Sequence, residues 1–511
     1  MQDLLVEKLA SFKDTGSLCR AASRLGRYPA GMLRRLTLLA IAMFCGLNPS
    51  FAQTAADPAP TPPMGWNSWD AYGLSITEAE FMANAMMLRD KLLPFGWRYA
   101  VIDEGWFLQN PQDRPTPDKL VYRLDSFGRY VPVPRRFISA GLQDAPTVVL
   151  GEHSVIDPDN RGFTALARWI HAQGLLFGIH IVRGIPRESV RRNLPIAGSS
   201  FRAQDAADTG DACPWDPTNW GVKDNAAGQA WYDALLKQYA VWGVDLVKVD
   251  CIADHPYKIS EIRQIRRAID RSGREMVLSL SPGPTNPAHA AEVASLANMW
   301  RISDDFWDTW AATKPGQTFP QPLKGQFDRL AAWSQFDLKP GQWPDADMLP
   351  IGELRPSPGW GEPRHTRFTP DEQKTLITLW SITQSPLILG ANLTLLDPAT
   401  MKLLINREVL RIDQHAAVRG KPVDAFRTGD LRVWRAEVRS ATDEPVVAVG
   451  LFNLSDAPMR VNRTASELGL QSPSKSATAK LFDIWAGRSL GRADRVQVTI
   501  PPHGCVLLEQ Q

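Results

Sequence analysis

The stretch WGVDLVKVDC, residues 242–251, begins with apolar residues and ends with an ammonium and a carboxylate two positions apart. If this stretch is a β-strand, alternation places Leu246, Lys248 and Asp250 on the same face. A neighbouring ammonium favours the ionised form of a carboxylate. An ionised, partly desolvated aspartate is suited to act as a nucleophile. For this segment alone, a structural ion pair buried in the fold is the alternative interpretation.

Three other apolar segments also end in carboxylates. YAVIDEGW carries Asp103 and Glu104, MWRISDDFWD carries Asp304 and Asp305, and GQWPDADM carries Asp345 and Asp347. If the ends of these segments lie close together, their carboxylates repel one another unless they bind a ligand. A divalent cation and a polyhydroxylated sugar are both ligands of this kind. Arg301 and Lys248 lie among the carboxylates, which favours the recognition of sugar hydroxyls over a magnesium site.

Hydrolysis of a glycosidic bond needs at least two carboxyl groups that face the substrate. One attacks the anomeric carbon while the other protonates the leaving oxygen. Side-chain parity along WRISDDF favours Asp305 over Asp304 as the second inward carboxylate. We therefore expect Asp250, next to Lys248, to be ionised and Asp305 to carry the proton.

Apolar strand patterns alternate with amphipathic helix patterns about eight times along the chain. The predicted strands are 64–66, 99–103, 175–181, 245–250, 276–280, 298–302, a weak one before Trp343, and 386–389. The predicted helices are 77–93, 162–173, 226–242, 260–272, 287–297, 324–334 and 370–383. This alternation predicts an α/β fold, a (β/α)8 TIM barrel in which the carboxyl ends of the strands form the active site. An open doubly wound sheet is the alternative.

Two long segments, 107–160 and 183–225, interrupt this alternation, and loops of such length are usually functional or disordered. The second contains RESVRRN, residues 187–193, which we interpret as a solvated helical face. In the alternative interpretation, Arg183 or Arg187 contacts the leaving group or an acidic branch of a polysaccharide.

The chain divides into three predicted parts. Residues 1–52 form a leader, because residues 32–52 combine a basic start, a short apolar core and small residues before a cleavage position at Ala52. Residues 53–412 form the barrel. Residues 413–511 alternate in the manner of a C-terminal antiparallel β-sandwich. We expect a periplasmic or secreted protein with no membrane association after cleavage, and a homo-oligomer is possible.

The composition excludes some functions. The whole chain has a net charge of +2, and the leader holds 7 of the basic and 3 of the acidic residues, so the remainder carries −2. The chain therefore lacks the excess of basic residues that would indicate a nucleic-acid partner. Three cysteines follow the leader, at positions 213, 251 and 505. Their spacing gives no zinc site, and a bridge between Cys213 and Cys251 stays open. The 18 Trp residues against 8 Tyr suit the stacking of sugar rings.

The motifs resemble, in order, those of glycoside hydrolase family 27, the α-galactosidases (melibiases), and indicate a bacterial member. The segments that carry this resemblance are PPMGWNSWDAYG, YAVIDEGW, GLLFGIHI, VDLVKVDC, MWRISDDFWDTW, GQWPDADMLPIG, EQKTLITLWSITQSPLILGANL and LLINREVLRIDQ. They extend over about 350 residues. The resemblance implies a retaining mechanism that needs neither a metal nor a cofactor, with a carbohydrate as the partner.

The resemblance also implies the roles of individual residues. Asp250 would be the nucleophile and Asp305 the acid/base. The candidate substrate-binding residues are Trp69 against the apolar face of the sugar, Asp103 at the axial O4, Lys248 near O3 and O4, Arg301 at O2 and Asp347 at the wall. Glu104, His180, Ser281 and Asp345 complete this set of substrate-binding residues.

Three departures from the family pattern concern the identity of the sugar. Glu104 replaces an aspartate, and its extra methylene reaches towards the space of the C6 hydroxymethyl group. His180 stands where many members have tyrosine. Ser281 lies in LSLSPGPTNP, which lacks the family's usual residues for reading the 2-substituent. We expect a hydrolase that releases terminal α-D-galactosyl residues. The alternatives are a β-L-arabinopyranoside, an α-N-acetylgalactosaminide or an isomalto-glucan as substrate, or a catalytically degenerate carbohydrate-binding protein.

Overall fold

The computed structural model describes residues 57–111, 119–142, 148–150, 154–355, 362–440, 443–470 and 479–510. These residues belong to one compact unit, Asp57–Gln511. The predicted leader, residues 1–52, lies outside the described residues.

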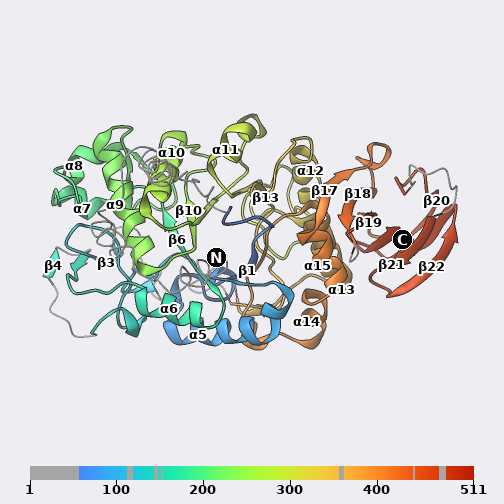
Figure 1. Cartoon of the computed structure of the whole chain (residues 1–511), viewed down its shortest axis with the longest axis horizontal. Helices are drawn as coiled ribbons and strands as arrows, with labels where there is room; N and C mark the ends of the chain where they lie inside the picture. Colours follow the sequence, from blue (N-terminus) through green and yellow to red (C-terminus); the bar gives the residue numbers. More distant parts are fainter. Residues whose placement is uncertain are drawn as a thin grey trace, which may run out of the picture. The chain divides into compact units, whose positions relative to one another are not determined.

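Eight parallel strands form a curled, TIM-like sheet in which neighbours follow chain order (Figure 1). They are β1 (Met64–Asn67), β2 (Tyr99–Ile102), β6 (Leu176–Val182), β10 (Leu246–Asp250), β11 (Val277–Leu280), β12 (Met299–Arg301), β13 (Trp343–Asp345) and β16 (Leu387–Leu389). β1 pairs with both β2 and β16, and a bridge between Leu349 and Leu389 links the segment after β13 to β16. The predicted α/β barrel is confirmed, and the weak strand begins at Trp343 instead of before it.

Helices surround the strands (Figure 1). They are α4 (Trp69–Tyr72), α5 (Glu78–Met87), α6 (Thr164–Ala172), α9 (Ala226–Trp242), α10 (Ile259–Ser272), α11 (Ala290–Leu296), α12 (Leu323–Trp333), α13 (Pro370–Thr383), α14 (Pro398–Leu404) and α15 (Arg407–Gln414). Their starts follow from capping chemistry. Thr77 and Thr369 each form a capping box with the glutamate three residues later, which satisfies free backbone N–H groups of the first turn.

The two interrupting segments fold locally instead of forming structureless loops. The first contains β3 (Tyr122–Leu124), β4 (Val148–Leu150) and β5 (Ser154–Ile156), in the order β3-β5-β4. The second contains β7 (Ile185–Pro186), β8 (Ala207–Ala212) and β9 (Asn219–Val222), with the short helices α7 (Arg187–Arg191) and α8 (Ala203–Ala206). In RESVRRN, Arg191 and Arg192 are exposed, in line with the predicted solvated face, whereas Glu188, Ser189 and Val190 are buried.

The C-terminal part contains a six-stranded antiparallel sheet, in the order β17-β18-β19-β24-β21-β22, and the pair β20-β23. Its strands are β17 (Ala416–Pro422), β18 (Leu431–Arg439), β19 (Pro445–Asn453), β20 (Met459–Thr464), β21 (Ala479–Asp483), β22 (Arg488–Ala493), β23 (Arg495–Ile500) and β24 (Cys505–Gln510). Alternation along β19 explains the packing: Val449 and Leu451 join the core shared with β20 and β23. Phe452, on the other face, packs on Phe327 of α12, with ring centroids 5.1 Å apart. The large sheet is therefore buried on both faces.

Candidate active site

A cavity of about 640 Å³ opens at the carboxyl ends of the barrel strands. Nine of the eleven residues proposed from the sequence line it: Trp69, Asp103, Glu104, Lys248, Asp250, Ser281, Arg301, Asp305 and Asp347. His180 and Asp345 do not line it. His180 lies behind Asp250, and Asp345 lines a smaller cavity of about 30 Å³ inside the barrel. The parallel strands thus bring together residues from six barrel strands or the segments that follow them.

Lys248 and Asp103 form an ion pair in the cavity wall. The Lys248 Nζ lies 2.8 Å from Asp103 Oδ2, which also accepts a 2.7 Å hydrogen bond from Asn67 Nδ2. Burial alone would raise the pKa of Asp103, but Lys248 and His180 outweigh burial and hold that pKa well below its ordinary value. Burial would lower the pKa of Lys248, and Asp103 and Asp250 instead raise it above its ordinary value. Both side chains are therefore charged.

Asp250 is held by two donors at the end of β10. His180 Nε2 lies 3.2 Å from its Oδ2, and the backbone N–H of Cys251 donates to its Oδ1. Burial acts to raise the pKa of Asp250, but His180, Lys248 and the Cys251 N–H lower it below the ordinary value. The predicted ionised state thus has a structural cause. The sequence assigned that cause to Lys248 alone, whereas the direct side-chain partner is His180.

Asp305 lies in the loop after β12, and its side chain is 46% exposed. Its Oδ1 is 3.3 Å from an Arg301 terminal nitrogen. The parity argument that favoured it over Asp304 is wrong in its premise, because the strand ends at Arg301. Both carboxylates line the cavity, and Asp304 lies 3.8 Å from the His255 ring. Geometry at the cavity, not strand parity, makes Asp305 the neighbour of Arg301.

Arg301 and Asp347 form a second ion pair in the cavity wall. A terminal nitrogen of Arg301 lies 2.7 Å from Asp347 Oδ2. The same oxygen accepts a 2.7 Å hydrogen bond from the backbone N–H of Phe306. Burial raises the pKa of Asp347 to about 7, despite the opposing effect of Arg301. Asp347 has a φ of 85°, and its own N–H donates to Asp345 Oδ1 at 2.8 Å. Asp345 thus fixes the turn at Asp347 by accepting this hydrogen bond, and it does not line the larger cavity.

Glu104 has a partner that the sequence did not reveal. Burial and the carboxyl of Asp216 raise the pKa of Glu104 well above its ordinary value. Asp216 also lines the cavity, although it belongs to the segment between β8 and β9. A second missed residue is Asp70, whose pKa is raised by burial and by Asp347. The available signal for Asp216 was its place in CPWDP, residues 213–217, within the second long inserted segment. Nothing in the sequence distinguished Asp70 from a surface carboxylate.

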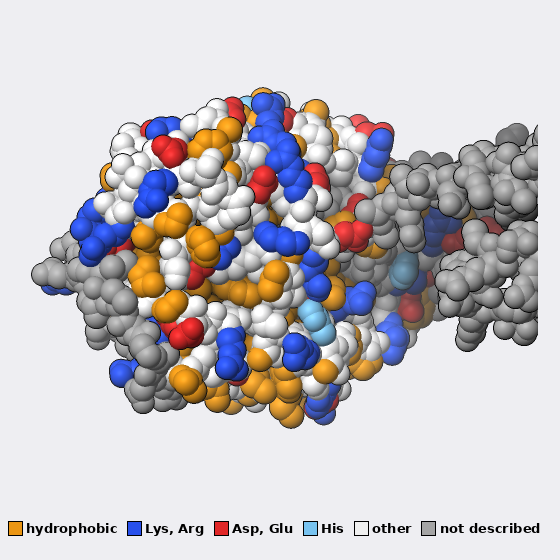
Figure 2. Space-filling view, turned by 60° about the vertical axis from the view of Figure 1, so that its left-hand side comes forward, with side chains coloured by type: hydrophobic (Ala, Val, Ile, Leu, Met, Phe, Trp, Pro, Cys, Tyr) orange, Lys and Arg blue, Asp and Glu red, His pale blue; other side chains and the backbone are white. Residues whose placement is uncertain are grey.

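Cys213 and Cys251 form a disulfide, which settles the pairing left open by the sequence, and Cys505 is a buried free thiol. Among the described residues, no group of three or more His, Cys, Asp or Glu side chains is arranged to hold a metal ion. In the same part of the chain, no helix has the length and apolar character needed to cross a membrane. On the face seen in Figure 2, basic, acidic and hydrophobic side chains are interspersed.

Comparisons with known proteins agree with this geometry. Residues 222–415 match the family model of alpha galactosidase A, and residues 428–510 match that of the alpha galactosidase C-terminal beta sandwich domain. The structure of a GH27 β-L-arabinopyranosidase from Geobacillus stearothermophilus is 39% identical, with a TM-score of 0.77, over 89% of this chain and 97% of that one. The chain belongs to glycoside hydrolase family 27.

Other relatives of this family 27 hydrolase differ in the sugar that their names give. A putative α-N-acetylgalactosaminidase from Bacillus halodurans is 36% identical, with a TM-score of 0.72, over 88% of this chain and 97% of that one. Alpha-galactosidase 2 of Arabidopsis thaliana is 25% identical over 87% of this chain and 88% of its own length. The family fixes the class of enzyme, a glycoside hydrolase, and leaves the glycone to be argued from the cavity.

The Lys248–Asp103 pair predicts how stability of this family 27 hydrolase depends on pH. The pKa of Asp103 is depressed in the folded state, so its contribution is present above its ordinary pKa of about 4 and is lost as the pH falls below that value. Lys248→Met leaves Asp103 buried without its cation. We expect the free energy of unfolding at neutral pH to fall by about 3–5 kcal/mol, and the loss of stability in acid to become shallower.

Urea denaturation between neutral and acidic pH measures both effects. Lys237→Met is the control, because Lys237 is exposed on α9 and, within the described part of the chain, donates only to the Ser272 carbonyl. An unchanged acid slope in Lys248→Met would show that the pair does not set the protonation of Asp103.

Proposed function

We propose that the protein is a retaining exo-glycosidase in which Asp250 is the nucleophile and Asp305 the acid/base. The observation that carries this proposal is the contrast between the two carboxylates in one cavity. The Asp250 side chain is 19% exposed and is kept ionised by His180, Lys248 and a backbone N–H, whereas the Asp305 side chain is 46% exposed. A nucleophile needs a fixed, ionised oxygen, and an acid/base must exchange protons with water.

The proposed reaction is a double displacement. An Asp250 oxygen attacks the anomeric carbon as the glycosidic bond breaks, and Asp305 gives its proton to the leaving oxygen. The products of this step are a covalent glycosyl ester on Asp250 and the free aglycone. Asp305, now ionised, removes a proton from water, which attacks the anomeric carbon and releases Asp250. Two inversions give net retention.

The cavity walls fit a pyranose with an axial hydroxyl. Trp69 offers an aromatic ring for the apolar face of the sugar, and the Asp103 carboxylate and Lys248 ammonium present an acceptor and a donor side by side. Arg301 and Asp347 form a second donor–acceptor pair across the cavity. In the order that the family pattern implies, the first pair binds O3 and O4, and Arg301 binds O2.

We propose β-L-arabinopyranose as the preferred glycone. α-D-Galactopyranose presents the same ring hydroxyls and adds a hydroxymethyl group at C5. Glu104, held against Asp216 in the cavity wall, brings an extra methylene into the space that this group needs. The 39% identical relative named as a β-L-arabinopyranosidase supports this choice. α-D-Galactoside is the second candidate, supported by the α-galactosidase relatives at about 25% identity.

We also propose that the enzyme works in the periplasm or outside the cell. The pattern of residues 32–52 favours a secretory leader. The Cys213–Cys251 disulfide supports the same location, because disulfides persist mainly in oxidising compartments.

Azide rescue tests the two catalytic roles. We expect Asp250→Gly to lose about 10⁴-fold or more of kcat/KM on an aryl glycoside. Azide should restore turnover and give the glycosyl azide of inverted configuration, the α-L-arabinopyranosyl or β-D-galactosyl azide. Asp305→Ala should lose about 10²- to 10⁴-fold on substrates with poor leaving groups. With activated aryl glycosides, azide should give the azide of retained configuration.

Asp304→Ala is the matched control, because Asp304 lines the same cavity one residue away. It should keep the leaving-group dependence of the wild type. If Asp304→Ala instead shows the behaviour expected of Asp305→Ala, the acid/base assignment is wrong. Wild-type turnover in Asp250→Gly would remove the nucleophile.

The glycone proposal is tested with Glu104→Asp, which shortens the side chain by one methylene. We expect the ratio of kcat/KM for the aryl α-D-galactoside to that for the aryl β-L-arabinopyranoside to rise by about 10-fold or more, since one methylene in a pocket is worth at least that much. Steady-state kinetics on both glycosides measures the ratio. A ratio that stays at the wild-type value would exclude Glu104 as the element that selects against the hydroxymethyl group.

A further inference from the structure

Arg183 lies directly behind the turn that follows the nucleophile strand. It comes immediately after β6, which pairs with β10 so that Val182 is opposite Asp250. The backbone N–H of Arg183 donates to the Asp250 carbonyl at 3.1 Å, and its Nε donates to the Cys251 carbonyl at 2.7 Å. One buried residue therefore holds the carbonyl groups of both residues at this turn.

The turn needs such support, because Cys251 has a φ of 62°. A non-glycine residue rarely adopts this left-handed conformation, which is unfavourable and persists only where the surroundings fix it. The same turn carries the Cys251 N–H that donates to Asp250 Oδ1. The disulfide to Cys213 holds the turn through its side chain, and Arg183 holds it through its backbone.

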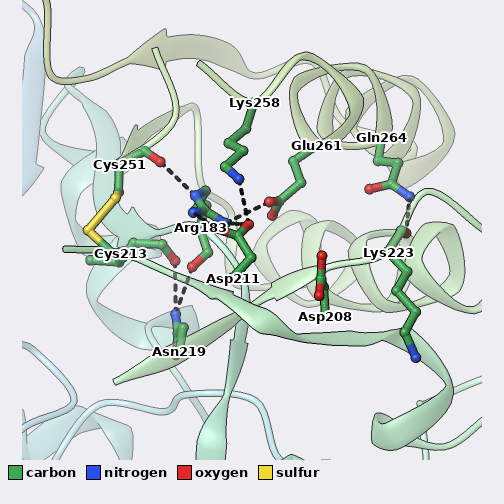
Figure 3. A network of polar contacts seen from close by, with 12 residues as sticks. Arg183, Asp208, Asp211, Cys213, Asn219, Lys223, Cys251, Lys258, Glu261 and Gln264 are labelled. Carbon is green, nitrogen blue, oxygen red and sulfur yellow. Dashed lines mark hydrogen bonds and ion pairs between the residues drawn. A yellow bond between two sulfur atoms is a disulfide. The ribbon is translucent and has the colours of Figure 1, made fainter. Parts of the chain in front are cut away.

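The remaining donors of Arg183 are used by two carboxylates, as Figure 3 shows. Its terminal nitrogens lie 2.9 and 3.0 Å from the two oxygens of Asp211, and one of them is 2.8 Å from Glu261. Lys258 also contacts Asp211, at 2.8 Å. The Arg183 side chain is 1% exposed and does not line the cavity. The alternative prediction that Arg183 contacts the leaving group is therefore wrong.

Asp211 and Cys213 belong to one short segment, so this segment is tied to the nucleophile turn twice. One tie is the ion pair of Asp211 with Arg183, and the other is the disulfide of Cys213 with Cys251. The segment continues to Asp216, the partner of Glu104 in the cavity wall. The same two ties thus connect the nucleophile to the part of the cavity wall that contains Glu104 and Asp216.

We propose that Arg183 and the Cys213–Cys251 disulfide form a clamp that positions the Asp250 carboxylate for attack on the anomeric carbon. The inference rests on the proposed function, in which Asp250 is the nucleophile. Arg183 is a positioning residue, since it touches neither the cavity nor the substrate. Without the clamp, the turn at Cys251 relaxes, and the Cys251 N–H no longer fixes Asp250 Oδ1. The bound sugar keeps its other contacts, so the first chemical step slows while sugar binding is retained.

Arg183→Lys tests the clamp, because it keeps the buried charge and loses the Nε donor and the planar fork. Active sites are counted with a 2-fluoro glycosyl inactivator, so that only folded, competent protein enters the rate. We expect kcat/KM per titrated site to fall about 10- to 100-fold, the effect of a misplaced reacting group. The inhibition constant of free L-arabinose, or of D-galactose if that is the glycone, should stay within about 2-fold.

Arg123→Lys is the matched control, since Arg123 is also a buried arginine in an ion pair, 2.9 Å from Asp157 in the other inserted segment. It should change neither quantity. The double variant Cys213→Ala/Cys251→Ala should lower kcat/KM in the same direction as Arg183→Lys. Adding Arg183→Lys to it should lower the rate by less than the product of the two separate effects, because both hold one turn.

A wild-type rate in Arg183→Lys would overturn the clamp. So would a fall in rate that is matched by an equal loss of sugar binding or by the Arg123→Lys control, or fully independent effects of Arg183 and the disulfide. The azide-rescue result for Asp250→Gly separates these outcomes from a failure of the proposed function. If that variant identifies Asp250 as the nucleophile, a wild-type rate in Arg183→Lys removes the clamp alone.

Discussion

The site depends on which of its carboxyl groups are ionised, because the desolvated cavity is lined by more carboxyl groups than cations. Eight carboxyl groups line the cavity, against the permanent cations Lys248 and Arg301. Coulomb repulsion in a buried site prevents all of them from being ionised together. Lys248 and His180 keep Asp103 and Asp250 ionised, whereas burial raises the pKa of Asp70, Glu104 and Asp347. This division supplies both acceptors and donors to a ligand covered with hydroxyl groups.

The fold was largely predictable because its strands are encoded locally. Most barrel strands are short, largely apolar runs, and all eight lie within a few residues of their predicted positions. Parallel strands have a common carboxyl edge, so predicting the strands also placed Asp103, Lys248, Asp250 and Asp347 in one cavity. The argument that Asp305 faces inward by alternation along the strand needed the exact strand length. It failed because β12 ends at Arg301, four residues before Asp305.

Features that depend on contacts distant in the sequence were not predictable. The inserted segments form small sheets through pairings such as β3 with β5, whose partners are about thirty residues apart. Asp216 reaches the wall beside Glu104 only because its segment folds back onto the barrel, and no periodicity signals that. The role of Arg183 was hidden in the same way. The sequence offered Arg183 only as a contact of the leaving group or of an acidic branch, whereas Asp211 and Glu261, distant in sequence, neutralise it in the interior.

The central claim is that Asp250 forms a covalent bond to the sugar. It is tested most directly by incubating the enzyme with 2-deoxy-2-fluoro glycosyl fluorides of the β-L-arabinopyranosyl and α-D-galactosyl series and mapping the labelled peptide by mass spectrometry. We expect one sugar per chain, attached within VDLVKVDC at Asp250, with faster labelling by the arabinopyranosyl reagent. A label on another residue, or turnover with inversion and no covalent adduct, would contradict the account.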